Sequence, residues 1–257
     1  VGEGVPASRV GERVWIYQAQ YGRRFGTAAE YVAIDSRRAP KLADEASFEV
    51  GACLGIPVMT AHRCVFADGD VAGQTVLVTG GAGRVGYYAI QWAALSGARV
   101  IATASNSDDE ATCRAAGAEI VVNHRNASWP NDLLDATKGA KVDRVVEVEF
   151  GENLENVLEV IRTGGVIATY SSSRNPTPQI PFYKMMFMDL TVRTVIVYAM
   201  PEIAKQQAIE DIDQALTAGK LTHRIAETLP LSQAAKAHDL IEQGQLRGCV
   251  ILKTDTV

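Results

Sequence analysis

A glycine-rich run between two apolar segments constrains this chain more than any other feature. Residues 80–86 read GGAGRVG, after the apolar segment 75–79 and just before a helix-like pattern that begins near residue 85. The glycines match the spacing G-x-G-x-x-G, in the strand–turn–helix context that separates dinucleotide-binding loops from chance matches. A pyrophosphate needs backbone N–H groups and the positive end of a helix dipole at close range, and glycine permits that approach. The sequence predicts a dinucleotide site here, with a purely structural turn as the alternative.

Short runs rich in Val and Ile recur through the middle of the chain. They are apolar throughout, which is typical of strands buried on both faces of a sheet. Helix-like patterns separate them, and this alternation predicts an α/β fold with a doubly wound parallel sheet of the Rossmann type. The predicted strands are 75–79, 98–104, 119–123, 142–148, 165–170 and 191–198, and the predicted helices are 85–96, 108–116, 130–137 and 153–162.

The two ends of the chain have a less regular pattern. We expect a Rossmann dinucleotide-binding domain at 50–218 and a second, β-rich domain built from 1–49 together with 219–257. The flanking elements predicted are strands at 14–17, 27–34 and 249–253, and helices at 47–54, 58–67, 202–218 and 232–243. The run Gly-Ile-Pro separates the first two of these helices.

Composition and charge exclude several classes of protein. The chain has 257 residues, is 47% hydrophobic and 21% charged, and carries a net charge of −5. This balance argues against a dedicated binder of nucleic acid or of anionic membranes. No apolar run approaches the roughly 20 residues of a membrane helix, and no signal peptide is visible. The four cysteines form no C-x-x-C pair, so we expect free thiols in a reducing cytoplasm.

The segment after the second predicted strand bears on the choice of nucleotide. An NAD-binding protein has an acid at this tip, where it binds the ribose 2′-hydroxyl. Here the strand ends in Ala104-Ser105-Asn106, which favours NADPH over NADH. The acids at 108–110 suit the first turn of a helix. Arg84, in the glycine loop, is a candidate partner for the 2′-phosphate.

Several motifs resemble the medium-chain dehydrogenase/reductase superfamily, and in particular its zinc-free quinone oxidoreductase branch, the zeta-crystallin-like proteins. They are GTAAEYVAI, GACLGIPVMTAHR, GQTVLVTGGAGRVG, GAEIVVNHR and PLSQAAKAHDLIEQGQLRGCVIL. The resemblance implies that the second domain is a GroES-like domain. It also implies hydride transfer from NADPH to a quinone or an α,β-unsaturated carbonyl, without a metal. The alternative is a non-catalytic, crystallin-like protein that binds NADPH.

Site residues follow from the same resemblance, position by position. Most lie just after predicted strands, where open α/β sheets bind ligands. The implied cofactor contacts are Thr60, Ala82, Gly83, Arg84, Val85, Ser105, His124, Asn153, Thr169, Tyr170, Ser171, Val195, Ile196 and Val197. The resemblance assigns no catalytic residue, so that role stays unknown. The segment 191–198 resembles the edge strand through which family members form homodimers, with a strand buried inside one subunit as the alternative.

Zinc dependence is not expected. Zinc enzymes of the superfamily carry a four-cysteine lobe where this chain has only QAQYGRRFG, and Ile56 stands near the place of a ligand cysteine. Other departures are Asp109, where many members have Lys, Tyr170 in place of a common glycine, and Cys249 in place of a usual Lys.

The front of the chain also departs from the family. Members carry roughly 75–80 further residues ahead of the position of Val1, and without them the strands at 14–17 and 27–34 would expose unpaired edges. We therefore expect the GroES-like domain to be incomplete, and the sequence to represent part of a longer enzyme.

Several side chains have both a functional and a structural interpretation. His124 could contact the cofactor or lie on a surface loop, and Tyr170 could stack near the nicotinamide or fill the loop. Glu147 and Glu149 end a strand near the expected cleft, where we expect them to cap N–H groups rather than act as an acid–base pair. The cluster 185–188, MMFM, is expected to be core or subunit contact.

Overall fold

The computed structural model describes residues 1–244 and 246–254. The chain forms two compact units, one made of Val1–Met59 with the segment from Pro201 onward, and one made of Thr60–Met200. The expected domain boundaries lay at 49/50 and 218/219, so both differ. The first differs because Gly51 and Gly55 pack closely on Leu42 and on the backbone of Ile16, which ties this helical segment to the N-terminal residues.

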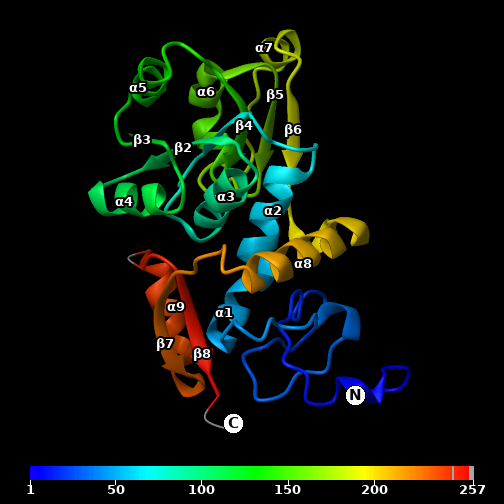
Figure 1. The fold of residues 1–257 in the computed structure, drawn as a ribbon. Coiled ribbons are helices and arrows are strands. Elements are labelled where there is room, and N and C mark those ends of the chain that lie inside the picture. Colours follow the sequence, from blue (N-terminus) through cyan, green and yellow to red (C-terminus); the bar gives the residue numbers. More distant parts are fainter. Residues whose placement is uncertain (245, 255–257) are drawn as a thin grey trace. The chain divides into compact units, whose positions relative to one another are not determined.

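The unit Thr60–Met200 is built on a parallel sheet of six strands, in the order β3-β2-β1-β4-β5-β6 (Figure 1). This confirms the doubly wound sheet. Three central strands are buried along almost their whole length, as their apolar runs predict. The strands are β1 (Thr75–Val78), β2 (Arg99–Ala104), β3 (Ile120–Asn123), β4 (Val142–Glu147), β5 (Ile161–Thr169) and β6 (Thr191–Thr194).

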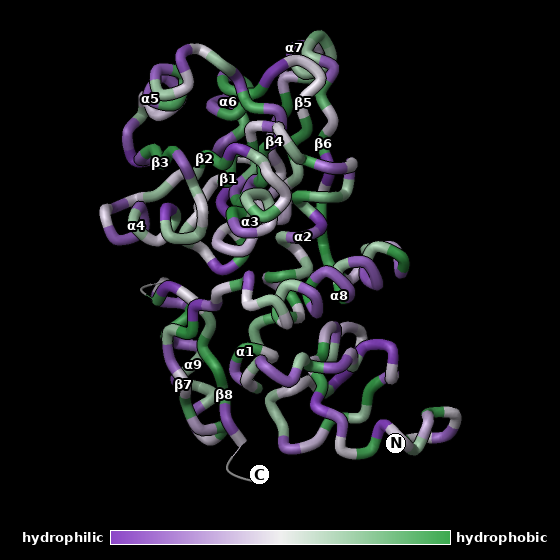
Figure 2. The backbone as a smooth tube through the Cα atoms, in the orientation of Figure 1, coloured by the Kyte–Doolittle hydropathy of each residue, from purple (hydrophilic) through white to green (hydrophobic). Residues whose placement is uncertain are grey.

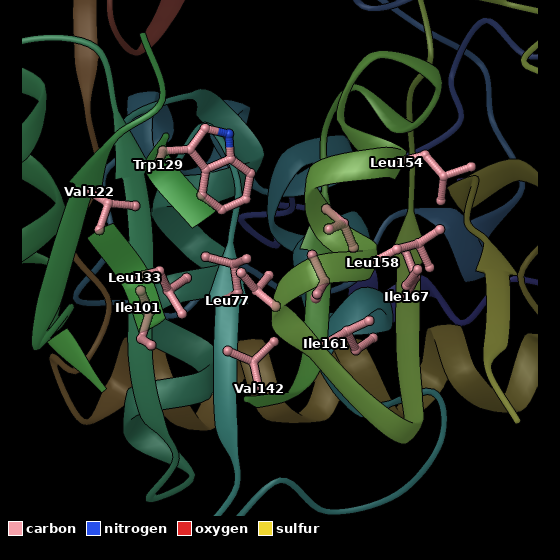
Figure 3. Close-up of a cluster of buried hydrophobic side chains, with 13 residues drawn as sticks. Leu77, Ile101, Val122, Trp129, Leu133, Val142, Leu154, Leu158, Ile161 and Ile167 are labelled. Atoms are coloured by element: carbon pink, nitrogen blue, oxygen red, sulfur yellow. The ribbon is translucent and has the colours of Figure 1, made fainter. Parts of the chain in front are cut away.

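Helices connect these strands and cover the sheet. They are α3 (Arg84–Leu95), α4 (Ser107–Ala115), α5 (Trp129–Ala136), α6 (Phe150–Val160) and α7 (Phe182–Phe187), the last of which the sequence pattern did not predict. One cluster of buried side chains lies between α5, α6 and the strands β1, β2, β4 and β5 (Figure 3). Its members Leu77, Leu133 and Leu158 are fully or almost fully buried. Burial of this apolar surface holds the strand ends in fixed positions.

The strand β6 lies at one edge of the sheet, and its burial pattern is mostly exposed. This excludes the alternative of a strand buried within one subunit. The expected strand 191–198 ends early, because its pairing with β5 ends at Thr194 and a 3-10 turn, η4 (Val197–Ala199), follows. In the cluster 185–188, Met185 and Met188 pack on the core, whereas Met186 and Phe187 are exposed.

The N-terminal part of the other unit does not contain the two predicted strands. Val14 forms an isolated antiparallel bridge with Lys41, and residues 27–34 form no strand. The backbone of Trp15 and Tyr17 bonds to Pro40 and Arg38 instead of to 27–34. The prediction was wrong because β propensity does not identify the pairing partner of a segment. Two short 3-10 turns, η1 (Ala7–Arg9) and η2 (Ser36–Arg38), lie in this region.

The helical segment that follows is continuous rather than broken at Gly-Ile-Pro. It comprises α1 (Phe48–Cys53), a π-helical turn η3 (Leu54–Val58) that contains Pro57, and α2 (Met59–Phe66). A wider π turn accommodates a proline that would clash inside an α-helix.

The C-terminal part holds α8 (Glu202–Thr217), β7 (Ile225–Pro230), η5 (Leu231–Gln233), α9 (Ala234–Glu242) and β8 (Cys249–Lys253). The pattern did not predict β7, which pairs in parallel with β8. Figure 2 shows both hydrophilic and hydrophobic stretches on α8. The buried face of this helix includes Ala208, Ile212 and Leu216, as the periodicity of its sequence predicts. Within residues 1–244 and 246–254, no helix has both the length and the apolar character needed to cross a membrane.

Candidate functional site

The residues that follow the strands of the parallel sheet lie along one edge. Backbone hydrogen bonds join each such residue to the neighbouring strand: the N–H of His124 donates to Ala104, that of Tyr170 to Glu147, and that of Val195 to Thr169. This edge is where open α/β sheets bind ligands, and the strand order reverses between β1 and β4. The structure thus brings His124, Tyr170 and Val195 to one edge.

The glycine loop lies at this edge, between β1 and α3. Gly80 has a φ of +59°, which favours glycine, and its N–H donates to Thr103 Oγ1 at 2.9 Å. A Cβ on Gly86 would collide with the carbonyl oxygen of Gly80, and one on Gly81 would lie 2.8 Å from Cys113 Sγ. Gly83 is exposed and caps α3, which begins at Arg84. The loop therefore presents bare backbone at the N-terminus of a twelve-residue helix, which is the geometry that binds phosphate.

The tip of β2 differs from the sequence interpretation in one respect. Asn106 caps α4 by accepting a hydrogen bond from the Asp109 N–H at 2.9 Å, as an N-cap residue does. The Asp109 carboxylate turns back to the tip, where Ser105 Oγ and Asn106 Nδ2 both donate to its Oδ2 at 2.9 Å. A carboxylate therefore stands beside Ser105 after all. Sequence reasoning saw the acid as part of the first helical turn and missed its side-chain direction.

His124 follows β3 and is an exposed residue. Desolvation of its ring, and next the charge of Arg125, lower its pKa, whereas Asp109 acts in the opposite direction. The charge of Arg174 also acts on this imidazole. His124 therefore lies within electrostatic range of two guanidinium groups and one carboxylate.

Glu147, at the end of β4, is almost fully buried. Its Oε1 accepts hydrogen bonds from the Glu149 N–H and, at 2.8 Å, from Asn153 Nδ2. Burial raises the pKa of Glu147 despite these bonds. The predicted contact Asn153 thus has its amide directed at Glu147, and Glu147 acts as a cap, as the sequence analysis expected.

Glu149 organises the loop after β5. Its carboxylate accepts from Ser173 Oγ and from the Arg174 N–H, both at 2.8 Å. Ser172 Oγ in turn accepts from the Gly151 N–H at 3.0 Å. These bonds hold residues 171–174 against the start of α6, so Glu149 is also a structural acid.

A cavity of about 410 Å³ opens between this loop and the end of β6. Five predicted site residues line it: Thr169, Tyr170, Ser171, Val195 and Ile196. Burial raises the pKa of Tyr170 well above its usual value, so its hydroxyl stays protonated at neutral pH. Sequence reasoning missed five further lining residues, which are Phe150, Ser172, Pro176, Pro178 and Thr194. Three of these lie in the Pro-rich segment 172–181, which was the signal that could have found them.

The remaining predicted residues do not line this cavity. Ala82, Gly83, Arg84 and Val85 belong to the glycine loop and the first turn of α3. Thr60 on α2 is 6% exposed and Val197 is 1% exposed, so both are buried. The strand β6 ends at Thr194, so the three residues expected on it, Val195, Ile196 and Val197, lie beyond its end.

Metal-ligating residues do not converge in the part of the chain that the structure describes, since no three His, Cys, Asp or Glu side chains there are placed to hold an ion. Cys53, Cys64, Cys113 and Cys249 are all free thiols.

The family model described as zinc-binding dehydrogenase matches residues 85–214, which is half of the chain. Mouse quinone oxidoreductase (Mus musculus) is 31% identical over 249 residues, covering 95% of this chain and 73% of its own length. The chain belongs to the medium-chain dehydrogenase/reductase superfamily. Within this superfamily, its curated relatives place it in the quinone oxidoreductase branch, as the motifs indicated.

Solved structures of this superfamily share the fold. An NAD-dependent alcohol dehydrogenase is 31% identical, with a TM-score of 0.81 over 90% of this chain and 66% of its own. A quinone oxidoreductase from Escherichia coli, complexed with NADPH, is 24% identical, with a TM-score of 0.86 over 98% of this chain and 78% of its own. The chain thus spans 66–78% of the length of these superfamily members.

Proposed function

We propose that this chain is an NADPH-dependent reductase that transfers a hydride to quinones or α,β-unsaturated carbonyl compounds without a metal. The observation that carries the proposal is the bare glycine loop at the N-terminus of α3, on the sheet edge that also carries the cavity beside β5 and β6. Membership of the quinone oxidoreductase branch supports the reaction class.

The residues of the described chain fit a nicotinamide dinucleotide. A Cβ would fill the cradle at Gly81 and Gly86, whereas Gly83 is open to a ligand. We assign the pyrophosphate to this loop and the nicotinamide half to the cavity lined by Thr169 and Tyr170. The bound nicotinamide would supply the hydride. The protein's part is to orient the two reactants and to exclude water.

The preference for NADPH rests on cations near the adenosine end of the site. Arg84 lies in the exposed first turn of α3, and the charges of Arg125 and Arg174 reach His124. These groups are suited to a 2′-phosphate. The Asp109 carboxylate opposes binding of this phosphate, because it is held at the tip of β2. We propose that the guanidinium groups outweigh this one carboxylate.

The edge strand supports a homodimer as part of the same proposal. The strand β6 has an unpaired side in the described chain, and Phe187, Val192 and Ile196 nearby are exposed apolar residues. An exposed strand edge of this kind pairs readily with a second copy. The four free thiols suit a reducing compartment, and we propose the cytoplasm.

Oxidation of NADPH by this chain, followed at 340 nm with 9,10-phenanthrenequinone or 1,4-benzoquinone as acceptor, tests the proposal. We expect enzyme-dependent turnover that a chelator does not abolish. A folded chain that binds NADPH without turnover would support the alternative of a non-catalytic, crystallin-like binding protein. Loss of turnover on treatment with a chelator, restored by zinc, would overturn the metal-free mechanism.

A further inference from the structure

Two elements of the first unit, α1 and β8, pack side by side (Figure 1). Glu49 and Cys53 are four residues apart on α1 and therefore share one face of the helix. Cys249 and Lys253 are four residues apart on β8 and therefore share one face of the strand. The Lys253 Nζ lies 2.5 Å from Glu49 Oε1, so these two faces meet.

The second pair across the same contact consists of two thiols. Cys53 and Cys249 lie across this contact, close enough for their side chains to interact. Cys53 also donates a hydrogen bond to the carbonyl of Glu49 at 3.3 Å, which fixes its side chain on this face. The N–H of Cys249 donates to Arg224 at 2.8 Å, which fixes the backbone at the start of β8.

The two thiols differ in accessibility. Cys53 is 1% exposed, whereas Cys249 is only partly buried. Cys249 can therefore meet a reagent from solvent, and Cys53 is placed behind it. Interaction with the Cys249 side chain, and next burial, raise the pKa of Cys53, which disfavours its thiolate while both thiols are reduced.

We propose that Cys53 and Cys249 form a reversible disulfide that links α1 to β8 under oxidising conditions. The proposal concerns a redox modification site, and it is independent of the proposed reductase function. The other two cysteines are not part of it. Cys64 is fully buried, and burial raises its pKa to about 12. Cys113 is fully buried beneath Gly81 of the glycine loop.

A low-molecular-weight disulfide such as oxidised glutathione is the oxidant class. The Cys249 thiolate attacks one sulfur of that disulfide, which forms a mixed disulfide and releases one glutathione thiolate. The Cys53 thiolate then attacks Cys249 Sγ, which closes the protein disulfide and releases the second glutathione thiolate. The protein loses two electrons and two thiol protons, and oxidised glutathione gains the two electrons as two thiols.

Thiol counting with mass spectrometry tests this on the full chain. The reduced protein is incubated with oxidised glutathione and then unfolded in acidic denaturant, and free thiols are blocked with N-ethylmaleimide so that the buried ones also react. The digest is searched for a peptide that joins Cys53 to Cys249. We expect the number of blocked thiols to fall from four to two, since the chain has four cysteines, and dithiothreitol to restore all four.

Matched variants keep the test independent of folding defects. Cys249→Ser, at the partly exposed position, should abolish the linked peptide, and Cys53→Ala should leave a stable mixed disulfide on Cys249. Cys64→Ala should form the linked peptide as the parent does. The proposal would be overturned if the parent kept four free thiols, if glutathione remained on Cys249 with Cys53 free, or if another pair were joined.

Discussion

One carboxylate at the tip of β2 bears directly on the choice of nucleotide. Asp109 is held there by Ser105 and Asn106, on the strand end where the adenosine ribose of a dinucleotide lies. Its charge would repel a 2′-phosphate and would be neutral or favourable toward a 2′-hydroxyl. We expect Asp109→Asn to bind NADPH about 5-fold more tightly, since removal of one like charge near the phosphate contributes about 1 kcal/mol. Binding is measured by nucleotide fluorescence.

The control for this substitution lies next to it in the chain. Asp108 is exposed in the same first turn of α4, and its side chain makes none of the contacts at the strand tip. Asp108→Asn should change NADPH affinity by less than about 2-fold, because an exposed charge is strongly screened. If both variants changed affinity equally, or if Asp109→Asn bound NADPH no better, the assignment of the 2′-phosphate to this tip would be wrong.

Two glycines of the loop separate folding from ligand approach. A Cβ at Gly86 would collide with the Gly80 carbonyl, whereas one at Gly83 would lie 3.1 Å from the same oxygen, with a φ of −71°. Gly86→Ala should therefore lower the free energy of unfolding, by roughly 1–3 kcal/mol. Gly83→Ala should cost less stability than Gly86→Ala, because its contact with the Gly80 oxygen is less severe. It should weaken NADPH binding at least 10-fold, because its methyl group would stand where the pyrophosphate approaches.

Urea unfolding and NADPH titration of the two glycine variants supply the two readouts. Gly2→Ala is the matched control, because nothing lies within 4 Å of a Cβ there. Unchanged NADPH affinity in a folded Gly83→Ala variant would contradict the assignment of the pyrophosphate to this loop.

At the scale of elements, one carboxylate ties the segment after α2 to two strands of the sheet. Asp68 accepts hydrogen bonds from Arg144 Nη2 on β4 at 3.0 Å and from Arg193 Nε on β6 at 2.9 Å. Arg144 is 3% exposed and also donates to the Cys64 carbonyl at 2.8 Å. The edge strand β6 is thus fixed by this ion-pair network, of which Arg144 is the buried member, as well as by its ladder with β5.

Removal of the Asp68 charge should be costly, because it leaves Arg144 buried without its counter-ion. We expect Asp68→Asn to lower the free energy of unfolding at pH 7 by about 3 kcal/mol. Asp44→Asn is the control: its ion pair with Lys41 is 3.7 Å long and exposed, so the change should be below about 1 kcal/mol. Urea unfolding measures both, and equal effects would show that the network does not stabilise the fold.

The same network makes stability depend on pH. Burial alone would raise the pKa of Asp68, but hydrogen bonds from Arg193 and Arg144 outweigh burial and lower it. Ionised Asp68 therefore stabilises the fold above its unfolded pKa, about 4, and this contribution is lost as pH falls through the lower folded-state value. Between pH 5 and pH 2.5, Asp68→Asn should lose less stability than the parent. The same dependence of the free energy of unfolding on pH in the parent and in Asp68→Asn would contradict this sign.

The elements that the sequence predicted well are those whose pattern is local. The buried strands β1, β2 and β4 follow from continuous apolar runs, and α8 from its 3.6-residue period. The segments 14–17 and 27–34 failed because strand formation depends on a pairing partner distant in sequence, and β7 was missed for the same reason.

The site was predictable to a similar degree. The edge of the parallel sheet follows from strand ends alone, so Ser105, His124 and Thr169 were placed there correctly. Side-chain direction does not follow from strand ends. The return of Asp109 to the tip, and the engagement of Asn153 with Glu147, depend on hydrogen bonds that only the folded structure reveals.

For the molecule as a whole, the exposed edge strand predicts self-association. We expect the chain to sediment as a dimer at micromolar concentration. Val192 on β6 is 37% exposed, and Val192→Lys should shift the equilibrium to monomer, because a charged edge resists strand pairing. Leu95→Lys, at a 45% exposed position at the end of α3, is the control and should remain dimeric. A monomeric parent in sedimentation velocity would contradict the proposed homodimer.

Titration of the purified, folded chain with NADPH and with NADH, followed by nucleotide fluorescence, tests the central claim most directly. The account predicts saturable binding of one nucleotide per chain, with NADPH bound more tightly than NADH. A chain whose circular dichroism shows a folded α/β protein, yet which binds neither nucleotide, would contradict the assignment of the glycine loop and the function built upon it.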